Sequence, residues 1–282
     1  MMANIKLIAD SGSTKTEWCL MGEKKPRYYF TQGLSPYFLD KSAIRDVLTA
    51  ELFPKLKKIK VDELYFYGTG CKSAENKRMM KAVFKSLFPT ASVVVEDDVT
   101  GAARGLCGKT KGVAAILGTG SSSCYFNGKR ITKNSPGIGY VLGDEGSGAA
   151  LGKMVVQHFL YGLMDEELEG RFTRKYGLDR ASILEAVYRK EKPNRFLASF
   201  TVFLAENRGH YMVENIIADG LNAFFYTHLI RFRESSLYPV NFTGGVSYVF
   251  RDVIEALCSD YGFVVGNIYK TPMEGLLKYH RG

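Results

Sequence analysis

Two apolar runs joined by a polar turn open the chain. Residues 5–9 and 16–21 have the short, β-prone composition of strands, and Gly12 lies in the turn between them. Helix and strand patterns then alternate, which is typical of an α/β domain. The expected helices are 41–56 (with helical spacing as far as Pro54), 75–88 and 99–106, and the expected strands are 61–70 and 91–98.

The same pattern starts again at Gly112. Residues 113–128 repeat the strand, turn and strand of the opening, and Gly120 falls 108 positions after Gly12. This repeat predicts a duplicated α/β core, with chance similarity between two glycine-rich hairpins as the alternative. The remaining expected elements are mainly helical segments over about 146–235, strands at 239–250 and 263–269, a helix at 251–261 and a short last helix at 272–280.

Composition and charge narrow the class of protein. The 282 residues are 46% hydrophobic and 24% charged, as in soluble globular domains, and the sequence has neither a long apolar run nor a signal-peptide pattern. Five scattered cysteines without a C-x-x-C pair predict no zinc site and no disulfide framework, so a reduced cytoplasm fits best. The net charge is +9, but Lys and Arg come in short, dispersed groups, which disfavours a nucleic-acid partner.

Three glycine-rich turns each follow an apolar strand. Their sequences are DSGSTKT at 10–16, GTGSS at 118–122 and TGGVS at 243–247. Glycine lets successive backbone N–H groups approach an anion, and the hydroxyls add further donors. Neither the Walker pattern nor the dinucleotide fingerprint occurs, which disfavours P-loop and dinucleotide-binding folds. The three turns together predict a phosphate-binding site.

The side chains of the first turn have separate expected roles. Asp10, at the end of its strand, is placed to hold Mg²⁺ directly or through water. The alternative for Asp10 is a turn-forming aspartate. Thr14 and Lys15 are placed to reach the terminal phosphates as a hydroxyl donor and a point charge.

The order of these motifs resembles that of the sugar kinase/Hsp70/actin ATPase superfamily. Within it, the chain is most similar to the N-acetylglucosamine kinase branch that is grouped with the BadF/BadG/BcrA/BcrD ATPases. The segments that carry the resemblance are DSGSTKT, EDDVTGAARG, LGTGSSS, GYVLGDEGSGAALGK, FTGGVSYVF and PMEGLLKYH. The resemblance implies duplicated ribonuclease H-like (actin-like ATPase) domains with a cleft between them. Their implied ranges are 1–110 with a C-terminal helix at 272–282, and 111–271 with a helical insertion at about 146–235.

The resemblance implies catalytic and binding roles for the positions of this chain that match the family's motifs. Asp98 resembles the general base that accepts the proton of the attacking sugar hydroxyl, and Asp97 is its rival because successive strand residues point to opposite faces. Asp144 matches an aspartate that accepts hydrogen bonds from sugar hydroxyls, with capping of the next helix, by it or by Glu145, as the alternative. The residues implied to bind ATP are Asp10, Gly12, Ser13, Thr14, Lys15, Gly118, Thr119, Gly120, Ser121, Gly244 and Gly245.

The chain departs from the family at two positions of the implied sugar site. Ser35 stands where the family has Asn, and Ile138 stands where it has Trp. Ser offers fewer hydrogen bonds than Asn, and Ile lacks a flat stacking face. The acceptor could therefore be N-acetylglucosamine, another amino sugar or an unrelated molecule. The residues implied to contact it are Ser35, Thr119, Gly137, Ile138 and Asp144.

The resemblance implies a cytoplasmic, homodimeric kinase that uses ATP and Mg²⁺ to phosphorylate a hydroxyl of an amino sugar. Two alternatives stay open. An iron–sulfur ATPase activator would need cysteines such as Cys107 and Cys124, but its Cys-Ala-Ala-Gly-Thr-Gly motif is absent. A sensor that binds ATP or sugar without turnover would fit the changes at Ser35 and Ile138.

Overall fold

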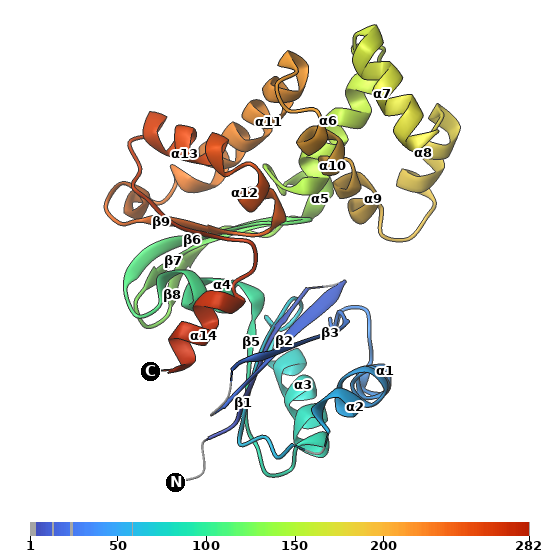
Figure 1. Cartoon of the computed structure of the whole chain (residues 1–282). Helices are drawn as coiled ribbons and strands as arrows, with labels where there is room; N and C mark the ends of the chain where they lie inside the picture. Colours follow the sequence, from blue (N-terminus) through green and yellow to red (C-terminus); the bar gives the residue numbers. More distant parts are fainter. Residues whose placement is uncertain (1–3, 13, 23–24, 58, 282) are drawn as a thin grey trace. The chain divides into compact units, whose positions relative to one another are not determined.

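The computed structural model describes residues 4–12, 14–22, 25–57 and 59–281. The chain forms two compact units, unit 1 (Met1–Lys109 with Pro272–Gly282) and unit 2 (Thr110–Thr271). Each unit is built around one five-stranded sheet (Figure 1). Among the described helices, none is long and apolar enough to cross a membrane.

The sheet of unit 1 has the strand order β3-β2-β1-β4-β5. β1, β2 and β3 pair antiparallel, whereas β4 and β5 extend the sheet in parallel from β1. The sequence did not predict β3, whose residues are mostly exposed because it forms an edge of the sheet. The strands are β1 (Lys6–Ser11), β2 (Lys15–Met21), β3 (Arg27–Gln32), β4 (Glu63–Gly68) and β5 (Ser92–Asp97).

Helices cover both faces of this sheet because successive strand residues point to opposite sides. Leu7 packs in one core with Phe84 of α3, while Ile8 packs in another with Leu276 of α14. The chain is helical over the expected range 41–56, and it continues past Pro54 because this proline lies in the first turn of α2, where proline is tolerated. The helices are α1 (Lys41–Val47), the π-helical η1 (Leu48–Leu52), α2 (Phe53–Leu56), α3 (Ala74–Leu87), α4 (Asp98–Cys107) and α14 (Met273–Arg281).

The sheet of unit 2 repeats this topology, with the order β10-β9-β6-β7-β8. Again three strands pair antiparallel and two extend the sheet in parallel, which confirms the predicted duplicated α/β core. The expected strand 239–250 ends at Thr243, because Gly244 turns the chain into a helix. The strands are β6 (Lys111–Leu117), β7 (Ser121–Asn127), β8 (Ile131–Asn134), β9 (Val240–Thr243) and β10 (Val265–Tyr269).

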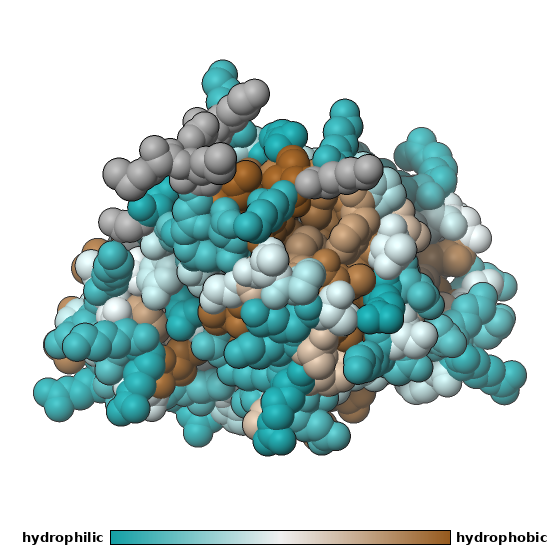
Figure 2. Space-filling model, turned by 90° about the horizontal axis from the view of Figure 1, so that it is seen from below, coloured by the Kyte–Doolittle hydropathy of each residue, from teal (hydrophilic) through white to brown (hydrophobic). Residues whose placement is uncertain are grey.

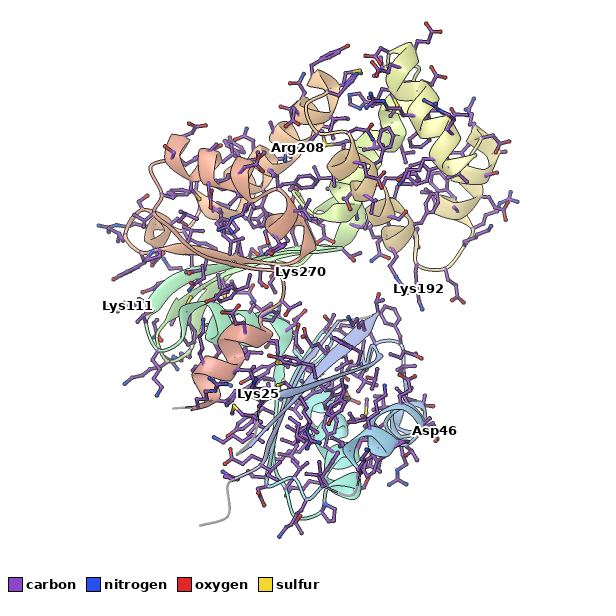
Figure 3. The ribbon with its side chains drawn as sticks, viewed as in Figure 1. Lys25, Asp46, Lys111, Lys192, Arg208 and Lys270 are labelled. Carbon is purple, nitrogen blue, oxygen red and sulfur yellow. The ribbon has the colours of Figure 1, made fainter. Side chains whose placement is uncertain are left out.

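Helices fill the rest of unit 2, and α7 and α8 lie away from its sheet (Figure 1). Phe225 stacks on Phe242 of β9 in the core. At the surface, Arg208 donates hydrogen bonds to Glu214 and Asp252 and so ties α11 to α13 (Figure 3). The helices are α5 (Gly139–Leu142), α6 (Gly148–Leu160), α7 (Glu166–Tyr176), α8 (Arg180–Tyr188), α9 (Pro193–Ser199), α10 (Thr201–Glu206), α11 (Tyr211–Phe224), the π-helical η2 (Phe225–Leu229), the 3-10 helix η3 (Arg233–Ser236), α12 (Gly245–Val249) and α13 (Arg251–Asp260).

Hydrophilic side chains predominate on the face that Figure 2 shows, and hydrophobic ones gather in smaller areas between them. Two of the most exposed aromatic residues, Tyr37 (63%) and Phe38 (67%), belong to the loop between β3 and α1. Single exposed apolar side chains are common on proteins. The position of this pair matters because its loop packs against Gly70, two residues after the end of β4.

A buried histidine fixes α14 on the sheet of unit 1. The Nε2 atom of His280 lies 2.9 Å from the hydroxyl of Tyr67, and its ring lies 3.9 Å from that of Tyr65. Burial, helped by the charges of Lys6 and Arg104, lowers the pKa of His280 to about 4. Between about pH 4 and pH 6.5, His280 is therefore protonated in the unfolded chain but neutral in the folded one.

We expect this histidine to make unit 1 acid-sensitive. Its contribution to stability is complete above pH 6.5 and is lost as the pH falls towards 4. His280→Phe should keep the ring packing but lose this dependence, so its stability relative to wild type should rise by about 2 kcal/mol between pH 7.5 and 4.5. Urea unfolding at both pH values measures this difference, and an unchanged difference would show that His280 is not the titrating group.

Candidate functional site

The carboxyl ends of three parallel strands lie side by side in unit 1 and form the edge of the sheet towards which these strands run. Ser11 of β1 pairs with Gly68 of β4, which pairs with Asp97 of β5. The next residue along β4, Thr69, donates its N–H to the carbonyl of Ser11 at 2.9 Å. The carboxyl ends of parallel strands are where open α/β sheets bind ligands.

Asp98 is held in place at this edge by two hydrogen bonds. The hydroxyl of Thr69 donates to Oδ2 of Asp98 at 2.7 Å, and the N–H of Val99 donates to Oδ1 at 3.0 Å. Burial raises the pKa of Asp98, while the Thr69 hydrogen bond opposes that rise. Its rival Asp97 instead caps α4, accepting the N–H of Thr100 at 2.7 Å. Of the two aspartates, Asp98 therefore has the geometry of a positioned proton acceptor.

Asp10 lies at the same edge, where the negative charge of Asp98 disfavours its ionised form. Burial, the Asp98 carboxylate and the Glu17 carboxylate raise the pKa of Asp10 to about 7. A divalent cation would relieve this crowding of negative charge, so the donor set fits Mg²⁺. No group of three or more metal-ligating side chains occurs among the described residues. The fit is therefore to Mg²⁺ held by one or two carboxylates and completed by water and phosphate oxygens.

The first glycine-rich turn forms a tight hairpin between β1 and β2. Gly12 donates its N–H to the carbonyl of Lys15 at 3.0 Å, and the hydroxyls of Ser11 and Thr16 lie 2.7 Å apart. The ammonium of Lys15 lies 3.7 Å above the ring of Phe30. Thr14 is exposed, and Ser13 lies outside the described residues.

Ser35 lies in the exposed aromatic loop and contacts the same strand edge. A Cβ atom on Gly70 would lie 3.0 Å from the hydroxyl of Ser35 and 3.1 Å from the ring of Tyr37. Since Gly70 follows Thr69 directly, the loop packs next to the residue that binds Asp98. The Ser35 hydroxyl is buried and accepts the N–H of Tyr37 at 3.4 Å. The structure thus brings Ser35 close to the Thr69–Asp98 pair, as a turn residue.

Two glycine-rich loops lie side by side in unit 2, because β6 and β9 are parallel neighbours. Gly118 donates its N–H to the carbonyl of Gly120 at 3.0 Å. The N-terminus of α6 closes on this loop, since its amides donate to the carbonyls of Gly118 and Thr119 at 2.8 and 3.1 Å. The second loop begins at Gly244, where a Cβ atom would lie 2.2 Å from the carbonyl oxygen of Leu117.

Two buried hydroxyls in these loops lack a protein partner. Ser121 Oγ, after the first loop, and Thr243 Oγ1, before the second, have no hydrogen-bond partner within the described part of the chain. Buried polar groups in folded proteins are nearly always satisfied. Both hydroxyl oxygens are buried, but the space above Gly118 and Gly245 is open, because a Cβ atom on either glycine would meet nothing within 4 Å.

The backbone at Gly244 allows a sharp test of the second loop. Its φ of 122° and its contact with Leu117 exclude a side chain, whereas a Cβ on Gly245 would meet nothing within 4 Å. We expect Gly244→Ala to lower the free energy of unfolding by about 2–4 kcal/mol, and the matched Gly245→Ala to change it by less than about 1 kcal/mol. Equal effects in thermal unfolding would contradict this assignment.

Asp144 adopts a left-handed conformation, with φ of 59°, in the loop between α5 and α6. Its carboxylate lies against Gly120, where a Cβ atom would come within 2.9 Å of Oδ2, and it accepts a hydrogen bond from the backbone of Ser121. Burial raises the pKa of Asp144, and the Ser121 hydrogen bond opposes this. Ser147, not Asp144 or Glu145, caps α6. The Asp144 carboxylate is therefore part of the glycine-loop region.

The other predicted sugar contacts of unit 2 lie next to this loop. Ile138 is 53% exposed, and a Cβ on Gly143 would lie 2.6 Å from its side chain. Gly137 is exposed, and a Cβ atom on it would meet nothing within 4 Å.

Cys107 and Cys124, the candidate cluster ligands of the activator hypothesis, are both buried.

Sequence reasoning missed Thr69, whose hydroxyl binds Asp98. A signal for it existed, because Thr69 is a hydroxyl residue near the end of the expected strand 61–70, where ligands bind in parallel sheets. It also missed the contact between Glu145 and His228, for which the spacing of the two residues in the sequence gives no signal.

Comparisons with known proteins agree with this architecture. A structure from Porphyromonas gingivalis, of a protein provisionally named N-acetylglucosamine kinase, is 39% identical, with 97% of this chain and 98% of that chain covered and a TM-score of 0.93. An N-acetylmuramic acid/N-acetylglucosamine kinase from Clostridium acetobutylicum is 34% identical over 84 residues, which span 29% of this chain and only 27% of that protein.

More distant likeness shows the fold alone. A ROK family glucokinase from Streptomyces griseus, solved with glucose and AMPPNP, is 16% identical, with 99% of this chain and 100% of that chain covered and a TM-score of 0.56. No family model matches the chain. From the extent and identity of the Porphyromonas gingivalis match, the chain belongs to the N-acetylglucosamine kinase-like family of sugar kinases.

Proposed function

We propose that the protein is an ATP-dependent kinase that phosphorylates a hydroxyl of an amino sugar, with Asp98 as the general base. The observation that carries this proposal is the buried Asp98 carboxylate, oriented by Thr69 at the edge where Asp10 also lies. The names of the two relatives support N-acetylglucosamine as the first acceptor to test.

The nucleotide would be bound by the glycine-rich turns. In unit 1, the hairpin after Asp10 offers the exposed side chains of Thr14 and Lys15. In unit 2, the two glycine-rich loops offer open backbone at Gly118 and Gly245. Mg²⁺ would be held beside Asp10, and when bound it neutralises charge on the phosphates.

The transfer needs one proton acceptor. The sugar hydroxyl gives its proton to Asp98 as its oxygen forms a bond to the γ-phosphorus, and the bond to the β-phosphate oxygen breaks to leave ADP. Thr69 and the N–H of Val99 each bind one oxygen of Asp98 and so fix its orientation, and each oxygen keeps a second lone pair that could accept the proton. The raised pKa of Asp98 makes it a stronger base than an exposed aspartate.

The acceptor would meet a polar and an aromatic surface. Asp144 offers a carboxylate for sugar hydroxyls, and Tyr37 offers an exposed ring that packs against Gly70, next to Thr69. The homodimer implied by the sequence resemblance stays a prediction.

Coupled ADP release with Mg²⁺ and ATP tests the proposal across glucosamine, N-acetylglucosamine, N-acetylmannosamine, N-acetylmuramic acid and glucose. We expect one or more amino sugars to raise the rate at least about tenfold over the sugar-free rate. If no sugar raises it although ATP binds in calorimetry, the sensor and activator hypotheses replace the kinase.

A further inference from the structure

The loop that carries Asp144 is attached to a distant helix through a buried histidine. The Nε2 atom of His228 lies 3.0 Å from Oε2 of Glu145, the residue after Asp144. The His228 side chain is 8% exposed and that of Glu145 is 29% exposed. A polar contact at this burial is costly to leave unmade, so it fixes the position of Glu145.

The same helix touches the loop a second time. The ring of His228 stacks on that of Phe224 at 4.9 Å, and a Cβ on Gly146 would lie 2.6 Å from the Cβ of Phe224. Phe224 ends α11, and His228 lies in the π-helical turn η2 that follows it. Single π-helical turns inside helices often occur at functional sites, where they re-aim side chains. Here the turn directs His228 to Glu145.

The loop needs such support because its backbone is strained. Asp144 has a φ of 59°, a conformation that costs about 1–2 kcal/mol for a residue other than glycine. Without outside contacts the loop would relax, and the Asp144 carboxylate would leave its place against Gly120. Asp144 thus contacts Gly120 and Ser121 through its own carboxylate, while the two residues that follow it contact His228 and Phe224.

We propose that His228 is a positioning residue that, through Glu145, holds the Asp144 carboxylate in the orientation that binds the acceptor. This inference rests on the proposed function for the role of Asp144, but the attachment itself does not. The charged groups near His228 are the carboxylates of Glu145 and Asp144, and both favour a hydrogen-bond donor at Nε2.

The test compares His228→Phe, which keeps the ring stacking but loses the hydrogen bond, with His228→Gln, which can still donate one. The chain offers a matched control in His210, whose Nε2 lies 2.9 Å from Oδ2 of Asp165 in the same unit, outside the site. His210→Phe breaks an equivalent pair. Glu145→Ala, at a partly exposed position, tests the same attachment if His228→Phe fails to fold.

We expect His228→Phe and Glu145→Ala to raise the KM for the sugar about tenfold or more, while the KM for ATP and kcat stay within about threefold of wild type. His228→Gln should recover most of the sugar affinity, and His210→Phe should leave all three constants within about twofold. A wild-type sugar KM in His228→Phe, or an equal rise in His210→Phe, overturns the proposal.

Hydrogen–deuterium exchange separates this inference from the proposed function. In the ligand-free protein, His228→Phe should speed exchange over residues 143–149, and His210→Phe should not. This result would support the attachment even if no sugar is phosphorylated by wild type, in which case only the role given to Asp144 fails. Unchanged exchange at 143–149 in His228→Phe would show that the histidine does not hold the loop.

Discussion

Asp98→Asn should reduce kcat for sugar phosphorylation by about 10³-fold or more, with little change in the KM for ATP. The amide has nearly the same shape and can still accept the hydrogen bond of Thr69 through its oxygen. It cannot take a proton from the attacking hydroxyl, so the loss falls on the chemical step rather than on binding.

Asp97→Asn is the matched control, because Asp97 precedes Asp98 directly and both are aspartates. Asparagine caps a helix about as well as aspartate, so the bond to Thr100 at the start of α4 should persist. We expect kcat to stay within about threefold of wild type. If Asp97→Asn abolished turnover while Asp98→Asn retained it, the assignment of the base would be reversed.

Asp10→Asn should have opposite effects on activity and on stability. Burial next to Asp98 and Glu17 raises the pKa of Asp10 from 3.8 to about 7. The folded state therefore favours the protonated acid. The stability that this preference contributes is complete below about pH 4 and is lost as the pH rises through 7. At pH 8, in EDTA, the neutral amide should stabilise the protein by roughly 2 kcal/mol, allowing for solvent screening, with a smaller gain at pH 5.

The same substitution should lower kcat by about 10²-fold or more, because it removes the carboxylate expected beside Mg²⁺. Asp46→Asn, on the exposed face of α1 (Figure 3), is the control for changing one aspartate and should leave both stability and activity nearly unchanged. Urea unfolding in EDTA and ADP release with Mg²⁺ measure the two effects. A loss of stability at pH 8 in Asp10→Asn would contradict the charge crowding at this edge.

Much of the fold could be predicted because it follows local patterns. The strand–turn–strand units around Gly12 and Gly120 and the helices between strands gave the duplicated α/β core. The strand β3 was missed because it is an exposed edge, where apolar and polar residues do not alternate clearly. The segment after Thr243 was misread because the β-prone residues Val246, Tyr248 and Val249 lie in a helix that begins at Gly245.

From the residue pattern alone, the candidate site could be predicted where its residues lie at the ends of strands. Asp10 and Asp98 come directly at strand ends, so the parallel order of the sheet brings them to one edge. The contact between Glu145 and His228 joins residues 83 positions apart and depends on a π-helical turn, which no sequence spacing reveals. Likewise, Ser35 could be marked as a departure from the family, but not as a buried turn residue beside Gly70.

Mass spectrometry of a reaction with N-acetylglucosamine, ATP and Mg²⁺, with Asp98→Asn run in parallel, shows whether the protein phosphorylates the sugar. We expect a sugar monophosphate and ADP in equal amounts from wild type, and almost none from the variant. ADP formed without a phosphorylated sugar, with every amino sugar of the panel, would contradict sugar phosphorylation as the function of this protein.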